Sequence, residues 1–443
     1  MTNQINKEQK RAPDGLIREA LVYAASPLSH GSDLDCLLDV VGDARLVLLG
    51  EASHGTHEYY EWRSAISRRL IKEKKFNFIA VEGDWSDCYE VNRYVKGHTR
   101  SKKSAREVLH VFSRWPTWMW ANWEVSRLVT WLREYNSALP PKSRVGFYGL
   151  DVYSLWDSLR AVTAYLKKVA PESIWAAERA YRCFEPHGEN PYDYAHAAAF
   201  VPDTCENDVT ELLVQVRRHA KRYAEAGDES HFNAEQNALV VSNAEHYYRT
   251  MLKGDVDSWN IRDRHMTETL GRIMHFYGPR SKAIVWAHNT HIGDARATDM
   301  ALSGMENIGS LVRERHADRG IVAIGFGSFK GGTIAAHAWD APMKHMEVPP
   351  AISMSWEWMM HEAFHGDRLI DLTVSPDALA TYHGHRAIGV VYRPEYERGN
   401  YVPTSLSRRY DAFLYLDETH PLRPFHLHPE IDPDFPETFP YGV

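Results

Sequence analysis

Short, nearly continuous apolar segments recur along the chain and constrain its fold more than any other feature. Most are bounded by charged or turn-forming residues, and helix-like stretches separate several of them. Unbroken apolar runs, unlike alternating ones, are typical of strands that are covered on both faces. We therefore predict an α/β fold whose parallel or mixed central sheet is flanked by helices. The predicted strands are residues 45–50, 76–81, 144–149, 282–287, 320–325, 386–391 and 413–416.

The strand pattern disappears between residues 155 and 278. Leu155, Leu159, Val162 and Leu166 follow a 3.6-residue period that is repeated between Ala234 and Met251, so a long helical insertion is predicted here. Pro171 and the Pro- and Gly-containing segment 185–191 are expected to divide it into separate helices.

This insertion predicts a division of the chain into three parts. Residues 1–154 form the first part of the α/β core, 155–278 a helical cap over the strand ends, and 279–443 the second part of the core. The tail after Asp417 contains six prolines and is expected to wrap around the core in an extended conformation.

Charge and composition exclude several classes of protein. The formal net charge of −8 gives no basic surface for a nucleic acid or an anionic membrane. The N-terminus is polar, and no apolar run is long enough to span a bilayer. The four cysteines form no C-x-x-C pair, which favours neither a disulfide framework nor a cysteine zinc site. We expect a soluble, cytoplasmic protein in a reducing compartment that acts on a small molecule.

Polar residues with catalytic chemistry follow three of the predicted strands. Glu51 and His54 follow the first strand, Glu82 follows the second, and His288 follows the strand at 282–287. A parallel sheet would bring these residues to one edge. Each alone is as easily a helix cap, but the set contains the imidazole base, the orienting carboxylate and the oxyanion donor that water activation requires.

The histidines also allow a metal-dependent alternative. His54 with His57, and His288 with His291, are H-x-x-H pairs that would share a metal at helical spacing, although both lie where a strand becomes a loop. The H-E-x-x-H match at 361–365 lacks the downstream ligand of a zinc protease and is interpreted as chance. Nucleotide-binding glycine motifs are absent, so we expect no nucleotide cofactor, and the absence of a G-x-S-x-G elbow argues against a serine hydrolase. The position of the two histidine pairs leads us to expect no metal.

The densest aromatic run leads into a predicted helix. Its tryptophans either pack in the core or form an aromatic wall of the substrate pocket. Spacing alone does not decide whether Arg63 reaches the site or lies in solvent. The tryptophans of this run are Trp115, Trp118, Trp120 and Trp123.

Five segments together resemble the erythromycin esterase family, in matching order from about residue 30 to 420. They are LGEASHGTHEYYEWR (49–63), AVEGDW (80–85), FSRWPTWMWANWEV (112–125), RDRHM (262–266) and WAHNTHIGDAR (286–296). The resemblance implies an α/β core with a helical cap, and hydrolysis of a macrolide lactone, a route to antibiotic resistance, without a metal or a covalent serine intermediate.

The resemblance also implies roles for individual residues. His54 is the activating histidine and Glu51 its accompanying acid, while Glu82, Arg63 and His288 complete the catalytic set. The tryptophans of the 115–123 run are expected to bind substrate, as are His57, Asn289 and His291. Two alternatives stay open beside the metal-dependent one: a non-catalytic member of the family, and an esterase with a non-macrolide substrate. The sequence predicts no oligomeric state.

Overall fold

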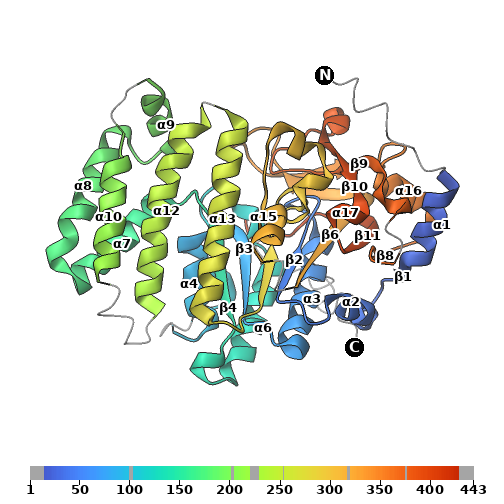
Figure 1. The fold of residues 1–443 in the computed structure, drawn as a ribbon, viewed down its shortest axis with the longest axis horizontal. Coiled ribbons are helices and arrows are strands. Elements are labelled where there is room, and N and C mark those ends of the chain that lie inside the picture. The colour runs from blue at the N-terminus through green and yellow to red at the C-terminus, as the bar shows by residue number, and fades with distance from the viewer. Residues whose placement is uncertain are drawn as a thin grey trace.

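The computed structural model describes residues 14–98, 103–200, 204–219, 229–252, 254–316, 320–374 and 377–428. Within them, nine strands form one mixed sheet, in the order β1-β8-β11-β6-β2-β5-β3-β4 with β7 paired to β6. The predicted fold class is confirmed (Figure 1). Six strands run parallel: β2 (Leu46–Leu49), β3 (Phe78–Asp84), β4 (Gly146–Asp151), β5 (Ala283–Trp286), β6 (Ile321–Ala335) and β11 (Ala412–Thr419). Three pair antiparallel: β1 (Ala25–Pro27), β7 (Lys344–Val348) and β8 (Arg368–Asp371).

Strand β2 lies at the centre of the sheet, where Leu46 pairs with Ala283 of β5 and Ile321 of β6. All four of its residues are buried. Leu46 and Leu48 belong to one hydrophobic core, and Val47 and Leu49 to another, because successive side chains of a strand point to opposite faces. An unbroken apolar run is what a strand covered on both faces requires.

Helices cover both faces of the sheet (Figure 1). One face packs against α2 (Asp35–Val41), α3 (His57–Lys74), α5 (Ala105–Leu109) and α6 (Trp123–Ser137), together with most of α4 (Trp85–Val95). The other packs against α1 (Asp14–Ala24), α13 (Asp255–Tyr277), α15 (Ile308–Arg315) and α16 (Trp356–Ala363). The short helices α14 (Asn289–Ile292) and α17 (Leu406–Arg409) lie in connections.

The predicted helical insertion is present between β4 and β5. Its periodic leucines, Leu155 to Leu166, pack against Ala234, Ala238 and Val241 in a hydrophobic core separate from those of the sheet. Figure 1 shows these helices beside the β4 edge, whereas α13 lies across the sheet. The three-part division at 154 and 278 stays a prediction. The separate core belongs to α7 (Leu155–Val169), α8 (Ile174–Phe184), α9 (Pro191–Phe200), α10 (Glu206–Arg218) and α12 (Glu229–Met251).

The prediction of a strand at 386–391 is wrong beyond Arg386. Strand β9 (Tyr382–Arg386) ends there and pairs with β10 (Tyr401–Ser405) in a separate two-stranded sheet. Residues 387–391 belong to none of the ladders of the central sheet, in which β6 has β2 and β11 as neighbours. In this segment, Ile388 and Val391 form only isolated bridges.

Cysteine usage was also predicted wrongly. Cys183 at the end of α8 and Cys205 before α10 form a disulfide, with Cα atoms 5.8 Å apart. The two helices pack side by side, so residues 22 apart in sequence meet without any local cysteine motif. The sequence argument for a reducing compartment therefore loses its basis.

The C-terminal tail lies against the core as far as the structure describes it. Pro421 bridges to Thr56, and Pro424 bridges to Asn122 at the start of α6. The rest of the predicted wrap, residues 429–443, lies outside the described residues, as do residues 1–13. None of the described helices is both long and apolar enough to cross a bilayer.

Candidate active site

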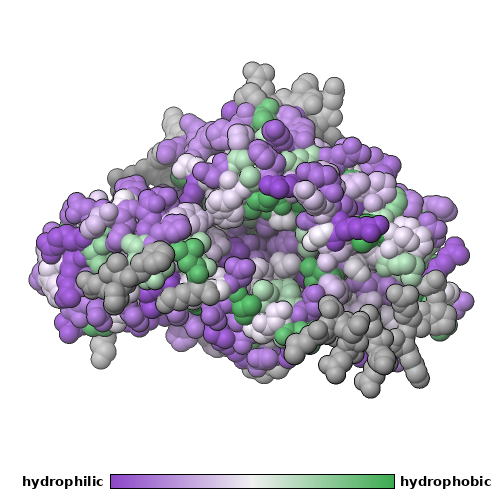
Figure 2. Space-filling model, turned by 90° about the horizontal axis from the view of Figure 1, so that it is seen from above, coloured by the Kyte–Doolittle hydropathy of each residue, from purple (hydrophilic) through white to green (hydrophobic). Residues whose placement is uncertain are grey.

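The carboxyl ends of four parallel strands carry the polar residues of the site. Glu51 follows β2, Glu82 lies near the end of β3, and His288 follows β5. Asp151, the last residue of β4, joins them although no prediction included it. His54, Glu82 and Asp151 line a cavity of about 540 Å³. Figure 2 shows a face of the molecule that is hollowed near its centre, with hydrophobic and hydrophilic residues around the hollow.

The loop after β2 is shaped by close backbone packing. Gly55 lies against β6, where a Cβ atom would be 1.9 Å from the carbonyl oxygen of Ile334. Gly50 is similarly crowded by Asn289, whose side-chain oxygen would lie 2.0 Å from a Cβ. The two glycines therefore permit the tight path that presents Glu51 and His54 at the sheet edge.

Glu51 connects His54 to Arg63. His54 Nδ1 donates to Glu51 Oε1 at 2.9 Å, and Arg63 Nη2 donates to Glu51 Oε2 at 2.6 Å. Because Nδ1 carries the proton, the lone pair of neutral His54 is on Nε2, which makes no hydrogen bond to another described residue and belongs to a side chain that lines the cavity. This is the arrangement that a general base needs.

Arg63 is buried on α3, which answers the question that spacing alone left open. Its side chain is 0% exposed, and its guanidinium lies over the rings of Tyr60 and Trp286, 4.3 and 4.6 Å from their centroids. The arginine therefore reaches the site from behind, through Glu51, and does not line the cavity.

His288 faces His54 with a ring-centroid distance of 5.0 Å. Burial and the neighbouring His54 hold the pKa of His288 well below its usual value, so its ring is neutral near pH 7. Thr290 donates its backbone N–H to His288 Nδ1, which leaves the proton on Nε2. That Nε2 is buried without a well-formed hydrogen bond, and the Ala52 carbonyl is only a weak partner of the ring. His288 does not itself line the cavity; it lies next to the cavity-lining His54 and carries its one N–H on Nε2.

Glu82 of β3, at the cavity wall, forms hydrogen bonds to the connection after β5 and to α13. It accepts the backbone N–H of His288 at 2.8 Å and the Nη2–H of Arg262 at 2.8 Å. Arg262, on α13, also donates to both carboxylate oxygens of Asp151. Burial opposes ionisation of Glu82, but His291 and Arg262 outweigh it and hold the pKa of Glu82 well below its ordinary value. Glu82 is therefore an ionised anchor.

His291 lies below this anchor and does not line the cavity. Its Nδ1 donates to Asp263 at 2.9 Å, and its ring stacks on Trp259 at 4.5 Å. Burial lowers its basicity, but Asp263 and Glu82 outweigh burial and raise the pKa of His291 to about 9. Its predicted contact with substrate stays untested, and its position favours a supporting role.

Two other predicted binding residues lie away from the cavity wall. His57 donates to Glu124 at 2.7 Å between α3 and α6. Asn289 is fully buried, and its side chain donates to the Phe326 carbonyl at 2.7 Å while its backbone N–H donates to Glu51 at 2.9 Å. Both therefore hold structural elements together.

The tryptophan run contributes to the cavity in part. Trp115 and Trp120 line it. Trp118 is fully buried behind Trp115, and Trp123 packs edge-on against Phe425 of the tail. Trp118 and Trp123 thus pack against the core and the tail, while substrate binding by Trp115 and Trp120 stays a prediction.

The two histidines of each H-x-x-H pair hydrogen-bond to different residues and do not face one common point. His54 and His57 bind different carboxylates, Glu51 and Glu124, and His288 and His291 point to different neighbours. In the part of the chain that the structure describes, no group of three or more His, Cys, Asp or Glu side chains is arranged to hold a metal ion. His365 lies beyond the end of α16, and His361 stacks on Phe329 and binds Asp417.

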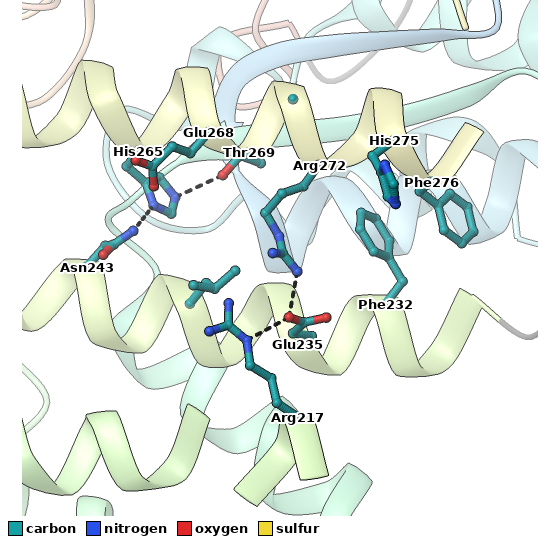
Figure 3. Close-up of a pocket in the computed structure, with 12 residues that line it drawn as sticks. Arg217, Phe232, Glu235, Asn243, His265, Glu268, Thr269, Arg272, His275 and Phe276 are labelled. Atoms are coloured by element: carbon teal, nitrogen blue, oxygen red, sulfur yellow. Dashed lines mark hydrogen bonds and ion pairs between the residues drawn. The ribbon is translucent and has the colours of Figure 1, made fainter. Parts of the chain in front are cut away.

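A second cavity of about 580 Å³ lies between α10, α12 and α13 (Figure 3). Its central carboxylate, Glu235, binds both Arg217 at 2.9 Å and Arg272 at 2.8 Å. Figure 3 shows these charges turned toward one another. None of the predicted site residues lines this cavity.

Comparison with known proteins shows which family shares this architecture. The model of the erythromycin esterase family matches residues 71–419, well over half of the chain. The chain belongs to the erythromycin esterase family. The match begins after the segment that carries Glu51, His54 and Arg63, so the roles of these three residues rest on their geometry.

Curated relatives of this erythromycin esterase family member are distant. Erythromycin esterase type II of Escherichia coli is 22% identical over 289 residues, which are 60% of this chain and 65% of that enzyme. The putative hydrolase YbfO of Bacillus subtilis is 23% identical, with 77% of each chain covered. The match thus spans just under two thirds of the E. coli enzyme. Family membership suggests a hydrolase with a small-molecule substrate.

Solved structures share the fold at similarly low identity. A succinoglycan biosynthesis protein has a TM-score of 0.74 at 20% identity, covering 93% of this chain and 98% of its own. A substituted erythromycin esterase EreC in its open conformation has a TM-score of 0.62 at 18% identity, covering 88% and 94%. These likenesses establish the fold of this erythromycin esterase family member.

Proposed function

We propose that the protein is a metal-independent hydrolase that opens an ester or a macrolide lactone with an activated water. The observation that carries this proposal is the Glu51–His54 pair, whose free Nε2 belongs to a cavity-lining side chain beside neutral His288. The printed name of the E. coli relative supports a macrolide as the substrate.

The reaction uses His54 as the base. Its Nε2 accepts a proton from water while the water oxygen attacks the carbonyl carbon, and the imidazolium that forms keeps its hydrogen bond from Nδ1 to Glu51. Arg63 holds the second oxygen of Glu51 in the same buried site, which fixes the carboxylate against His54.

His288 stabilises the negative charge that develops on the carbonyl oxygen. Its Nε2–H, which has only the Ala52 carbonyl as a weak partner among the described residues, is the proton that this neutral ring offers. When the tetrahedral intermediate collapses, the leaving alkoxide takes a proton from protonated His54, so ester and water become acid and alcohol. Glu82 fixes His288 through its backbone N–H.

The test is a hydrolysis panel of macrolides and simple esters, with mass-spectrometric detection of the product that has gained one water. His54→Ala should lower kcat by about two to four powers of ten because general-base catalysis contributes that much. His345→Ala, a change at an exposed histidine on β7, is the control and should leave kcat unchanged. Full activity of His54→Ala, or loss of activity on chelation with EDTA, would contradict the proposal.

A further inference from the structure

Two histidines that the proposed mechanism does not use face one another outside the cavity. His345 is exposed on β7, and His428 is half-buried in the C-terminal tail. Their Nε2 atoms are 3.4 Å apart, whereas their ring centroids are 5.5 Å apart. The two imidazoles therefore approach each other through their Nε2 edges. Neither histidine lines the cavity of the candidate active site.

The separation of the two Nε2 atoms matches that of two ligands on one metal ion. Histidine nitrogens bind Zn²⁺ at about 2.0–2.1 Å in a tetrahedral arrangement, which puts two of them about 3.3–3.4 Å apart. A well-formed hydrogen bond from an N–H group is usually no longer than about 3.2 Å. The contact is thus loose as a hydrogen bond, but it has the spacing of a pair of zinc ligands.

The backbone holds both histidines in place. His345 pairs with Ile334 of β6 in the antiparallel ladder. The backbone N–H of His428 donates to the Pro424 carbonyl at 2.8 Å. The carbonyl of His428 accepts the indole N–H of Trp123, also at 2.8 Å. Two ligands whose backbone is already fixed lose little conformational entropy when they bind an ion.

The path of the tail explains why the two histidines meet. Residues paired directly across two antiparallel strands lie on the same face of the sheet, as do residues two apart in one strand. Glu347, which pairs with Gly332, is therefore on the same face as His345. A Cβ atom on Gly332 would lie 2.8 Å from Pro421 of the tail. The tail thus crosses the face of the sheet that carries His345 and brings His428 to it.

The chemistry of the pair selects the kind of ion. Imidazole nitrogen suits Zn²⁺, Cu²⁺ and Ni²⁺, whereas Mg²⁺ and Ca²⁺ take oxygen ligands. The spacing favours Zn²⁺, and the carboxylate of Glu347 adds a negative charge on the same face of β7. Among the described residues no cluster of three His, Cys, Asp or Glu side chains could hold the ion, so water completes its coordination.

We propose that His345 and His428 bind a Zn²⁺ ion that fastens the C-terminal tail to β7. The tail also supports the loop after β2, because the backbone N–H of Leu422 donates to the Gly55 carbonyl at 2.8 Å. The ion therefore stabilises the segment on which this loop rests. It lies outside the cavity and takes no part in hydrolysis, so the inference is independent of the proposed function.

Zinc binding by the full chain tests the site. The protein is stripped with EDTA, dialysed and titrated with ZnCl2 by calorimetry at about pH 7.5, where free imidazole is neutral. His345→Ala and His428→Ala should each weaken zinc binding at this site at least about tenfold, because each removes a direct ligand. Zinc should also raise the Tm of the wild type by more than that of either variant. MgCl2 should give no heat that depends on either histidine.

His426→Ala is the matched control. His426 is exposed in the same tail segment, and its ring contacts that of His110. This variant should bind zinc as the wild type does and show the same rise in Tm. Equal zinc binding by the wild type and His345→Ala, or an equal loss of zinc binding in His426→Ala, would overturn the site.

Discussion

The carboxylate of Glu51 binds an arginine and a histidine at the same time. This distinguishes the Glu51–His54 pair from the similar Glu124–His57 pair nearby. One oxygen of Glu51 accepts from His54 Nδ1 and the other from Arg63. Glu124 likewise accepts from Nδ1 of a histidine, His57, through one oxygen. His54 lines the cavity and His57 does not. The two histidine–carboxylate pairs are therefore chemically alike but differ in access to substrate.

This difference gives a paired prediction. Glu51→Gln should lower kcat by about two to four powers of ten, because a neutral amide neither fixes the Nδ1–H tautomer nor stabilises the imidazolium. Glu124→Gln should leave kcat within about twofold and lower only the free energy of unfolding, by about 1–3 kcal/mol for a buried hydrogen bond to a charged group. Steady-state kinetics and urea unfolding of both variants measure the contrast. Equal loss of kcat in both would show that His57 takes part in the reaction.

The expectation that polar residues at the ends of parallel strands meet at one edge of the sheet predicted part of this site. It correctly brought Glu51, His54, Glu82 and His288 to one edge of the sheet. Applied to the strand at 144–149 it would also have found Asp151, two residues beyond Gly149. No sequence pattern predicted that Arg262 and Asp263 would belong to the site. Their contacts with Glu82 and His291 depend on how α13 crosses the sheet.

At the scale of elements, periodicity predicted the helices of the insertion but gave no information about how they pair. Leu155 to Leu166 and Ala234 to Val241 are buried where the 3.6-residue period placed them. The Cys183–Cys205 link was missed because it depends on the packing of α8 against α10. The 15-residue length of β6 was missed for a similar reason, since its second half is a strand only through pairing with β7 and β11.

The disulfide closes a loop that includes Glu189 and Tyr192 at the cavity wall. Removing it with Cys183→Ser and Cys205→Ser together should lower the free energy of unfolding by about 3 kcal/mol, the loop-entropy value for a link of this length. Thermal unfolding with and without a reductant measures the effect. Cys36→Ser, at a half-buried free thiol, is the control and should respond to the reductant as the wild type does. A wild type unaffected by complete reduction would contradict the prediction.

At the scale of the whole molecule, one buried charge network joins the insertion side to the sheet. Arg262 and Asp263 come from α13, Glu82 and Asp151 from strand ends, and His291 from the connection after β5. No stretch of sequence contains more than two of these residues, so the sequence could predict the layers but not this connection between them. Charges so deeply buried make stability depend on pH.

His291 contributes to that dependence on the alkaline side. Burial and the guanidinium of Arg262, 3.1 Å away, disfavour its charge, but Asp263 and Glu82 outweigh them and its pKa rises to about 9. A raised pKa contributes stability that is fully present below about pH 6.5, the value in the unfolded chain, and is lost as the pH rises through 9. The loss is at most about 3 kcal/mol.

The measurement is urea unfolding at pH 6.5 and pH 9 for the wild type and for His291→Gln. The wild type should lose more stability between the two pH values than the variant, because the variant lacks the group that releases its proton. Comparing the two proteins cancels the titration of residues that they share. Glu82 acts on the acidic side only, since its lowered pKa gives stability that is lost below about pH 4.5. An identical alkaline loss in both proteins would show that His291 is neutral in the folded state.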